Sequence, residues 1–394
     1  MVSPRSRATL AYVAAFAAIG AAFPYLPVHY RALGLDLAAI GALGALWAAA
    51  SLVAAPAWGA LTDRLPRSRA LLPAAALLSA AAALGLSQAQ DLPAVAIGVA
   101  AVAGATSGVT PMLDARTLDI LGDDRGQFGR IRAWGSISFI VSTVAVGLLM
   151  DRWGDDALFA VYVPMYIVTA IVAVWLPRSR RSSATGSLRA GASRVIRAPG
   201  MAVFLAAALL TWTSVVLINS FLSVRLVDLG APAGLVGMAW VVGSIVEVPI
   251  MFAFPRLAAR FGAHRLLLLG AVFFAVRGCL YVLADRPDLL VAGGTLEGAG
   301  FGLFFVASVG YVAELAPRGR IATAQGVHSA MAFGVAAVIG AALGGAIATA
   351  ITIPGLFAVG AVASIISVGV LALALRAAPR AAPTGPAPVD STVG

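Results

Sequence analysis

Long apolar segments follow one another along almost the whole chain, and short polar segments separate them. Each apolar run is close to the roughly 20 residues that an α-helix needs to cross a bilayer. The pattern therefore predicts an all-α membrane protein with twelve transmembrane helices. The expected spans are 8–30, 38–62, 70–88, 93–118, 129–150, 156–176, 200–226, 234–256, 265–284, 288–314, 321–349 and 353–376.

The chain resembles itself at a fixed offset of 196 residues, since the charged turn at 59–69 returns at 255–265. At this offset the matched pairs are Arg64 with Arg260, Arg69 with Arg265, Gly34 with Gly230, and Gly41 with Gly237. A period this long indicates two pseudo-symmetric halves, as in secondary transporters. We expect a first six-helix half at 1–176, a cytoplasmic linker at 177–199, a second six-helix half at 200–376 and a disordered tail at 377–394, which is rich in Ala and Pro.

Composition supports the membrane class and gives an orientation. Only 11% of the 394 residues are charged, about half the share of a soluble domain. The net charge of +10 comes from 27 basic residues, all of them Arg. They lie in short loops, which argues against nucleic-acid binding. With the N-terminus in the cytoplasm, 22 Arg fall on the cytoplasmic side, 4 on the other side, and Arg277 within a span. This bias predicts a multi-pass protein of the cell membrane with both termini cytoplasmic.

Two further points concern processing and disulfides. The first apolar run is long and precedes many similar runs, so we interpret it as an uncleaved span and not as a signal peptide. The single cysteine, Cys279, excludes an intrachain disulfide.

Three ionisable residues fall deep within spans of the second half: Glu247, Arg277 and Glu297. At about 1.5 Å per residue, each lies roughly 14–20 Å from a helix end, near the middle of the bilayer. Charges there are costly and usually face a cavity or a partner. Two carboxyls and one guanidinium leave one negative charge unmatched, which a bound proton would neutralise. We expect Glu297 or Glu247 to carry a proton; the alternative is a purely structural ion network.

The first half offers a second candidate site. Asp114 and Arg132 fall on the fourth and fifth spans, and such a pair can bind hydroxyls or a carboxylate; alternatively, it is a salt bridge at the cytoplasmic helix ends. Tyr25, in a Pro-broken aromatic stretch of span one, and the span residues Trp134 and Asn219 are further candidate substrate contacts. The alternative for these three is helix packing or an interfacial position.

The charged turn suits a gate. It contains Gly59, Asp63, Arg64, Arg67 and Arg69. Asp63 at a helix end can accept hydrogen bonds from an Arg or from helix N-terminal amides, which would hold the two halves closed on the cytoplasmic side. The alternative is loop charge that only sets topology. The chain has no Walker loop and no Cys/His metal spacing, so we expect no enzyme activity, no cofactor and no metal.

These motifs resemble the major facilitator superfamily. The segment Gly59-x-x-x-Asp63-Arg64-x-x-Arg67 is similar to its signature between helices two and three, with Pro66 where a second glycine is usual. The resemblance covers about 8–376 and implies a fold of six plus six helices, a central cavity and rocking-type alternating access. The fifth span lacks the Gly-Pro antiporter motif of many drug exporters.

Within the superfamily, the chain resembles the lactose permease and phenylpropionate permease branch. The resemblance rests on Phe23-Pro24-Tyr25-x-Pro27, on the segments 114–118 and 128–136, on Glu247-Val-Pro249, and on Arg277 and Glu297 with their 20-residue spacing. It implies that Asp114 and Arg132 contact substrate and that Arg277 and Glu297 belong to the proton-coupling machinery. Glu297 stands where the branch's sugar permeases have His, and Gly300 stands where they have their main proton-carrying acid.

The function expected from the sequence is proton-coupled symport of a small organic solute, either a sugar, a nucleoside or an aromatic acid. The alternatives are a proton-coupled efflux antiporter for drugs or metabolites and a membrane sensor that does not transport. The expected partners are the solute, protons and the lipid bilayer, without nucleic acid, and the expected state is a monomer.

Overall fold

The computed structural model describes residues 3–65, 69–122, 124, 127–177, 193–317 and 320–377. Helices of the first half are α1 (Pro4–Ala22), α2 (Leu26–Ala32), α3 (Leu37–Arg64), α4 (Leu71–Ser87), α5 (Leu92–Thr106), α6 (Val109–Leu121), α7 (Phe128–Trp153) and α8 (Ala157–Val174). Those of the second half are α10 (Met201–Asp228), α11 (Ala233–Phe261), α12 (Ala263–Leu283), α13 (Pro287–Leu315), α14 (Ile321–Ala330), the π-helix η2 (Met331–Val335) and α15 (Ala336–Ala377).

The helices follow the expected spans, with breaks where the backbone departs from the helical path. The first span is divided into α1 and α2 by a turn at Phe23–Tyr25, where Pro24 removes a backbone donor. The fourth is divided into α5 and α6 at Ser107 and Gly108. Expected spans eleven and twelve form one apolar stretch, Thr323–Arg376, which turns at Thr352 with φ of 80°.

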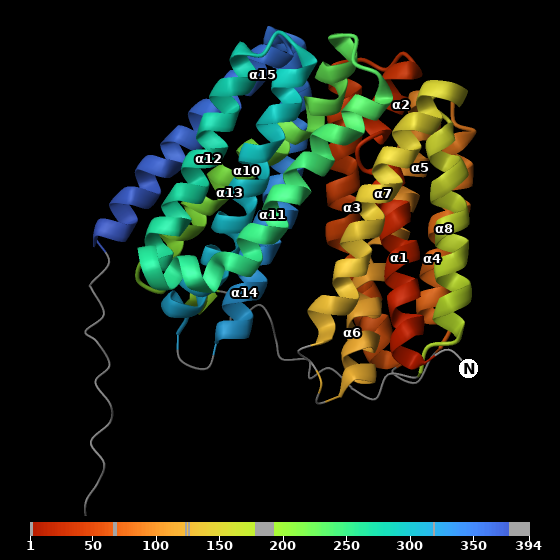
Figure 1. Cartoon of the computed structure of the whole chain (residues 1–394), viewed down its shortest axis with the longest axis horizontal. Helices are drawn as coiled ribbons and strands as arrows, with labels where there is room; N and C mark the ends of the chain where they lie inside the picture. The colour runs from red at the N-terminus through yellow and green to blue at the C-terminus, as the bar shows by residue number, and fades with distance from the viewer. Residues whose placement is uncertain are drawn as a thin grey trace, which may run out of the picture.

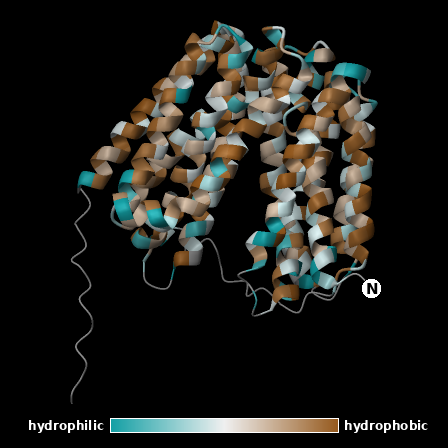
Figure 2. Cartoon of the chain, in the orientation of Figure 1, coloured by the Kyte–Doolittle hydropathy of each residue, from teal (hydrophilic) through white to brown (hydrophobic). Residues whose placement is uncertain are grey.

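By length and composition, ten helices in the described part of the chain can cross a membrane. The tenth contains two expected spans, and α4 is an apolar helix of 17 residues. Figure 2 shows hydrophobic residues along the lengths of the helices and hydrophilic residues mainly at their ends. Large apolar side chains are widely exposed, with Val53 at 75% and Leu283 at 78%. Such a surface requires an apolar surrounding, which a bilayer supplies.

Two helical bundles make up the molecule, α1–α8 and α10–α15 (Figure 1). The bundles meet at the end where α2 lies, and their ribbons splay apart toward the end that carries the N-terminus. The predicted linker and tail lie mostly outside the described residues.

The internal repeat has matching structure in both copies. Gly34 and Gly230 each follow a helix and each have φ of +79°, a left-handed conformation that favours glycine. The amide after each glycine donates back into the helix: Leu35 N to Tyr30 O at 3.2 Å, and Ala231 N to Leu226 O at 2.9 Å. The same residue spacing therefore builds the same helix end twice.

The second repeated glycine pair lies where the bundles touch. A Cβ on Gly41 of α3 would overlap the Cα of Gly345 in α15, so these two backbones are in direct contact. A Cβ on Gly237 of α11 would overlap the hydroxyl of Tyr25. Both positions exclude a larger side chain, because the helices of the two halves approach too closely.

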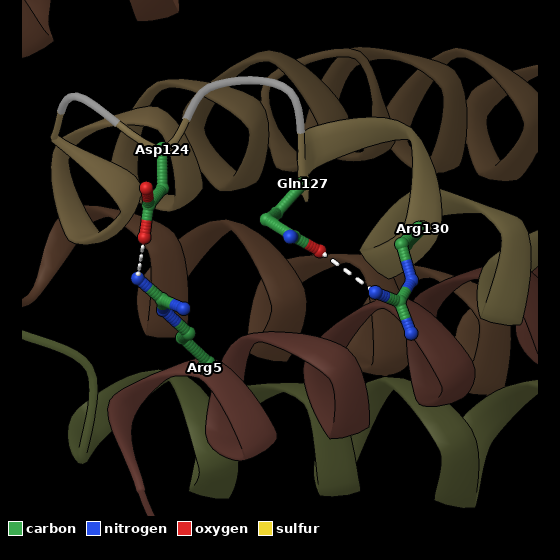
Figure 3. A network of polar contacts seen from close by, with 4 residues as sticks. All are labelled: Arg5, Asp124, Gln127 and Arg130. Carbon is green, nitrogen blue, oxygen red and sulfur yellow. Dashed lines mark hydrogen bonds and ion pairs between the residues drawn. The ribbon is translucent and has the colours of Figure 1, made fainter.

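At the N-terminal end of the first bundle, polar contacts join helix α1 to the segment between α6 and α7 (Figure 3). Arg5 forms a 2.5 Å ion pair with Asp124, and Arg130 donates to Gln127 at 3.2 Å. Arg7 also donates to the backbone oxygen of Trp175 at 3.0 Å. Because the Arg5–Asp124 pair is more than half exposed, its contribution to stability is small, about 0–1 kcal/mol.

Candidate functional site: a cavity between the two halves and a polar cluster in the second half

A buried polar cluster joins three helices of the second half. The guanidinium of Arg277, on α12, is 2% exposed and donates from Nη2 to Asn219 Oδ1 of α10 at 2.6 Å. The amide of Asn219 in turn donates from Nδ2 to Glu297 Oε1 of α13 at 3.4 Å. The guanidinium also lies 4.7 Å from the ring centroid of Tyr281. Asn219 therefore stands between the cation and the carboxylate.

The three predicted charges do not pair directly. Within 4 Å, the ion pairs among the described residues include none between Arg277 and either glutamate. Glu297 lies against α11, since a Cβ on Gly243 would come within 2.8 Å of its Oε2. Glu247 is one turn farther along α11 and is partly exposed. The structure thus shows an amide-bridged cluster and a nearby second carboxyl in place of the ion network that was the alternative to a proton carrier.

The candidate residues of the first half, Asp114 and Arg132, each contact an aromatic side chain of α1. The hydroxyl of Tyr12 donates to the carboxylate of Asp114 on α6. One turn away, the ring of Phe16 lies under the Arg132 guanidinium of α7, at 5.7 Å. Asp114 is half-buried and Arg132 is exposed, and no ion pair within 4 Å joins them in the described structure. Both groups keep hydrogen-bonding capacity for a ligand.

Trp134 and Tyr25 lie elsewhere. Trp134 is 54% exposed and shares one helical face of α7 with the exposed residues Ile137 and Val141, almost opposite Arg132. Tyr25 is fully buried and donates from its hydroxyl to Thr143 O at 2.6 Å. These positions bring neither side chain to the Asp114–Arg132 pair.

The residues of the expected gate lie partly outside the part of the chain that the structure describes. Arg67 is outside the described residues, and of Asp63 only the backbone is described, in the last turn of α3. Arg64 ends α3, Arg69 lies in the following turn, and both are exposed. A Cβ on Gly59 would meet no atom within 4 Å, so close helix packing does not require this glycine. The role of this turn as a latch stays a prediction.

A cavity of about 280 Å³ lies between the two halves. Its aromatic lining residues are Phe23, Tyr30, Trp47, Tyr162, Tyr166 and Trp240. Thr106, Asn219 and Ser220 are its other polar lining residues, and none of the residues that line it carries a formal charge. Because Asn219 belongs to both structures, the cavity and the buried cluster share one residue.

The end of the molecule near α2 is closed by contacts between the halves. Helix α11 begins after Pro232, whose side chain cannot cap it, so its first amides need an outside acceptor. Asp151 of α7 supplies one: its two oxygens accept from Ala233 N at 2.7 Å and from Gly234 N at 3.0 Å. Arg31 and Asp228 add an ion pair of 3.7 Å across the same boundary.

Reasoning from the sequence missed most of the aromatic cavity lining and this cap. The signals were several aromatic residues within spans, such as Trp47, Tyr162 and Trp240, and an acid directly after the fifth expected span, Asp151. Each signal is weak alone, because aromatic residues are common in membrane helices and acidic residues are common at the ends of such helices. Among the described residues, no three His, Cys, Asp or Glu side chains form a group suited to a metal ion.

Comparison with known proteins agrees with this architecture. The model of the MFS_1 like family matches residues 7–358. The maltose permease of Geobacillus stearothermophilus is 29% identical over 338 residues, covering 85% of this chain and 86% of that protein. The putative nucleoside transporter YegT of Escherichia coli (strain K12) is 27% identical over 240 residues, covering 57% and 56%.

Among solved structures, a mutant form of the nucleoside transporter NupG superposes with a TM-score of 0.85. The superposition covers 94% of this chain and 100% of NupG at 16% identity, which shows a shared fold. The predicted twelve-helix fold in two six-helix bundles is thereby confirmed. The relatives are membrane transporters and not enzymes. The chain belongs to the MFS_1 like family and is a multi-pass small-solute transporter of the major facilitator superfamily.

Proposed function

We propose that this transporter moves a small organic solute by alternating access, in symport with protons. It acts as a monomer in the cell membrane with both termini in the cytoplasm. In the described conformation the halves are joined at the α2 end by Asp151 and by the contact of Gly41 with Gly345. The excess of Arg at the opposite end supports a cytoplasmic position for that end.

The proposal rests on one observation: the side chain of Asn219 takes part in both the cavity and the polar cluster. Its side chain lines the cavity and also bridges Arg277 and Glu297. A solute that binds Asn219 changes the hydrogen bonding around both charged groups. In turn, a proton on Glu297 removes the charge that the Asn219 amide donates to. Solute binding and proton binding are thereby linked through one amide, and linkage of this kind is reciprocal.

Transport by reconstituted protein tests the coupling. In proteoliposomes with a pH gradient, the wild-type protein should accumulate solute above equilibrium. Glu297→Gln should abolish accumulation, because the amide cannot release a proton, while solute exchange at equal concentrations continues. Glu247→Gln tests the second carboxyl in the same way. Glu314→Gln is the matched control, since Glu314 lies on the same helix but is exposed and pairs with His264.

The outcomes separate the alternatives. If both Glu297→Gln and Glu247→Gln keep full pH-driven accumulation, the proton is not carried by these groups. If the pH gradient drives solute in the direction opposite to the protons, the protein is an antiporter. If solute binds but never crosses the membrane, the protein is a sensor.

A further inference from the structure

We propose that the cavity between the halves binds an uncharged nucleoside, with the base against the aromatic side chains and the ribose at Asn219 and Ser220. The inference rests on the proposed function, since it names the solute of that same site. It selects one of the three solute classes expected from the sequence. Three properties of the cavity carry it: its charge, its polarity and the placement of its rings.

The lack of positive charge in the cavity lining argues against an aromatic acid as the solute. The lining of the cavity contains no Arg, Lys or His that could pair with a carboxylate. Arg277 lies behind Asn219, is 2% exposed, and is not itself a lining residue. A carboxylate moved from water into this surrounding would lose part of its hydration without gaining a counter-charge, which is unfavourable. The same argument excludes a nucleotide, because its phosphate is charged.

Polarity and size argue against a disaccharide. A disaccharide carries hydroxyls on all sides, and each one buried without a partner costs free energy. Most of the lining is apolar, with residues such as Ile19, Leu26, Leu43 and Val216. The volume of about 280 Å³ lies just below the range of roughly 300–1,000 Å³ that is typical of small-molecule sites. A solute with one apolar ring and one polar end fits better.

The aromatic lining residues come from both halves, and four of the six form two pairs. Phe23 and Trp240 meet edge to face across the boundary between the halves, with ring centroids 5.0 Å apart. Tyr162 and Tyr166 have centroids 4.8 Å apart on α8. The indole nitrogen of Trp240 already donates to Ser223 at 3.2 Å, so the ring face is the part left for a ligand. Nucleobases stack on aromatic side chains with little dependence on which base is present.

The cavity lining also contains polar side chains that can form hydrogen bonds with a nucleoside. Asn219 and Ser220 are adjacent on α10 and both line the cavity. The Asn219 amide keeps one N–H beyond its bond to Glu297, and the Ser220 oxygen, whose proton is donated to Val216 O, keeps capacity to accept. The hydroxyl of Tyr166 is buried beside those of Thr106 and Tyr162, and within the described residues it makes no hydrogen bond of good geometry. A ligand that offers a better partner would stabilise it, and a nucleobase carries both donors and acceptors at its edge.

Binding to the purified full-length protein tests this, and calorimetry without any ion gradient is suitable. The probes are uridine, uridine 5′-monophosphate, ribose, maltose and phenylpropionate. Uridine should bind at least about tenfold more tightly than each of the others, since a difference of this size corresponds to one lost favourable contact. The inference is overturned if any other probe binds as tightly as uridine, or if uridine shows no binding at millimolar concentration.

Variants locate the site. Trp240→Leu should weaken uridine binding about tenfold, as expected for loss of one stacking contact. Trp175→Leu is the control, because Trp175 is 58% exposed and lies outside the cavity. If Trp240→Leu does not fold, Trp47→Leu takes its place, since Trp47 also lines the cavity. Equal loss of affinity in the control and the test variant would contradict the assigned site.

Failure of this inference is distinguishable from failure of the proposed function. If uridine binds but a pH gradient never drives its accumulation, the coupling is wrong and the ligand class stands. If protons drive maltose accumulation and uridine does not bind, the coupling stands and the ligand class is wrong.

Discussion

At the scale of single residues, Asn219 connects the buried Arg277 to Glu297 within the second half. It provides the acceptor for the Arg277 guanidinium at 2.6 Å, and the Nε of Arg277 is buried without a partner in the described structure. An isolated cation in a membrane interior is costly, so the amide oxygen has a large effect on stability. The same side chain lines the cavity, so a substitution of Asn219 should change both the stability of the protein and its affinity for a ligand.

We therefore expect Asn219→Ala to destabilise the protein by about 3 kcal/mol, because it leaves the buried Arg277 without its acceptor. Thermal unfolding in detergent measures the effect. Ser220→Ala is the matched control: Ser220 is the next residue, also lines the cavity, and its hydroxyl only donates to Val216 O of its own helix at 2.8 Å. If both variants unfold at the same temperature, Asn219 does not stabilise the guanidinium.

At the scale of helices, the closure of the α2 end depends on one helix capping another. Pro232 precedes α11 and leaves its first amides without a local cap, and Asp151 on α7 accepts from two of them. A carboxylate at a helix N-terminus is favourable both as a hydrogen-bond acceptor and through the helix dipole. Here the favourable contact exists only while the two halves are together at this end.

Asp151→Ala should therefore shift the protein toward a conformation that is open at the α2 end. Loss of a cap costs about 1 kcal/mol, which corresponds to a population change of about fivefold. The measurement is the labelling rate of Ser220→Cys in the cavity by a membrane-impermeant thiol reagent added outside, in a Cys279→Ser background. We expect labelling to accelerate about fivefold.

The control for this experiment is Asp36→Ala. Asp36 caps α3 of its own half, accepting from Ala39 N at 2.7 Å, so this substitution removes a cap without touching the boundary between the halves. Acceleration by Asp36→Ala as large as that by Asp151→Ala would show that the contact across the boundary is not responsible.

At the scale of the whole molecule, the distribution of Arg predicts the orientation, and the internal repeat predicts the symmetry. In the predicted topology most Arg outside the spans fall on the cytoplasmic side, and in the structure Gly34 and Gly230 end equivalent helices in the two halves. The equivalent glycines Gly41 and Gly237 both lie at contacts where the halves approach closely. The two copies of the repeat thus each carry a small residue at a contact between the halves.

The orientation gives a direct prediction. A fluorescent protein fused after residue 376 should fluoresce, because it folds in the cytoplasm. An epitope inserted in the turn between α4 and α5, near Gln88, should be detected from outside intact cells, and one in the turn after α6, near Gly122, should not. The opposite pattern would reverse the assigned topology and contradict the Arg bias as its cause.

The sequence predicted the class of the protein and its helices well, and the site only in part. Spans were recognisable because a bilayer demands a long run of apolar residues whatever the packing. Arg277 and Glu297 were singled out as candidate site residues because charges in spans are rare. The connection between them through Asn219 was not predicted, because an asparagine within a span is usually a packing contact. Most of the aromatic lining was missed for the same reason.

The amino-acid sequence by itself determined that this is an all-α membrane protein of two related halves, because apolar run length, Arg distribution and a fixed repeat are one-dimensional properties. Only the tertiary structure decided which residues meet. Asn219 contacts partners 58 and 78 residues away, and Asp151 caps a helix 82 residues later. These contacts depend on how each helix is rotated and which helices are neighbours, and no local pattern in the chain specifies either.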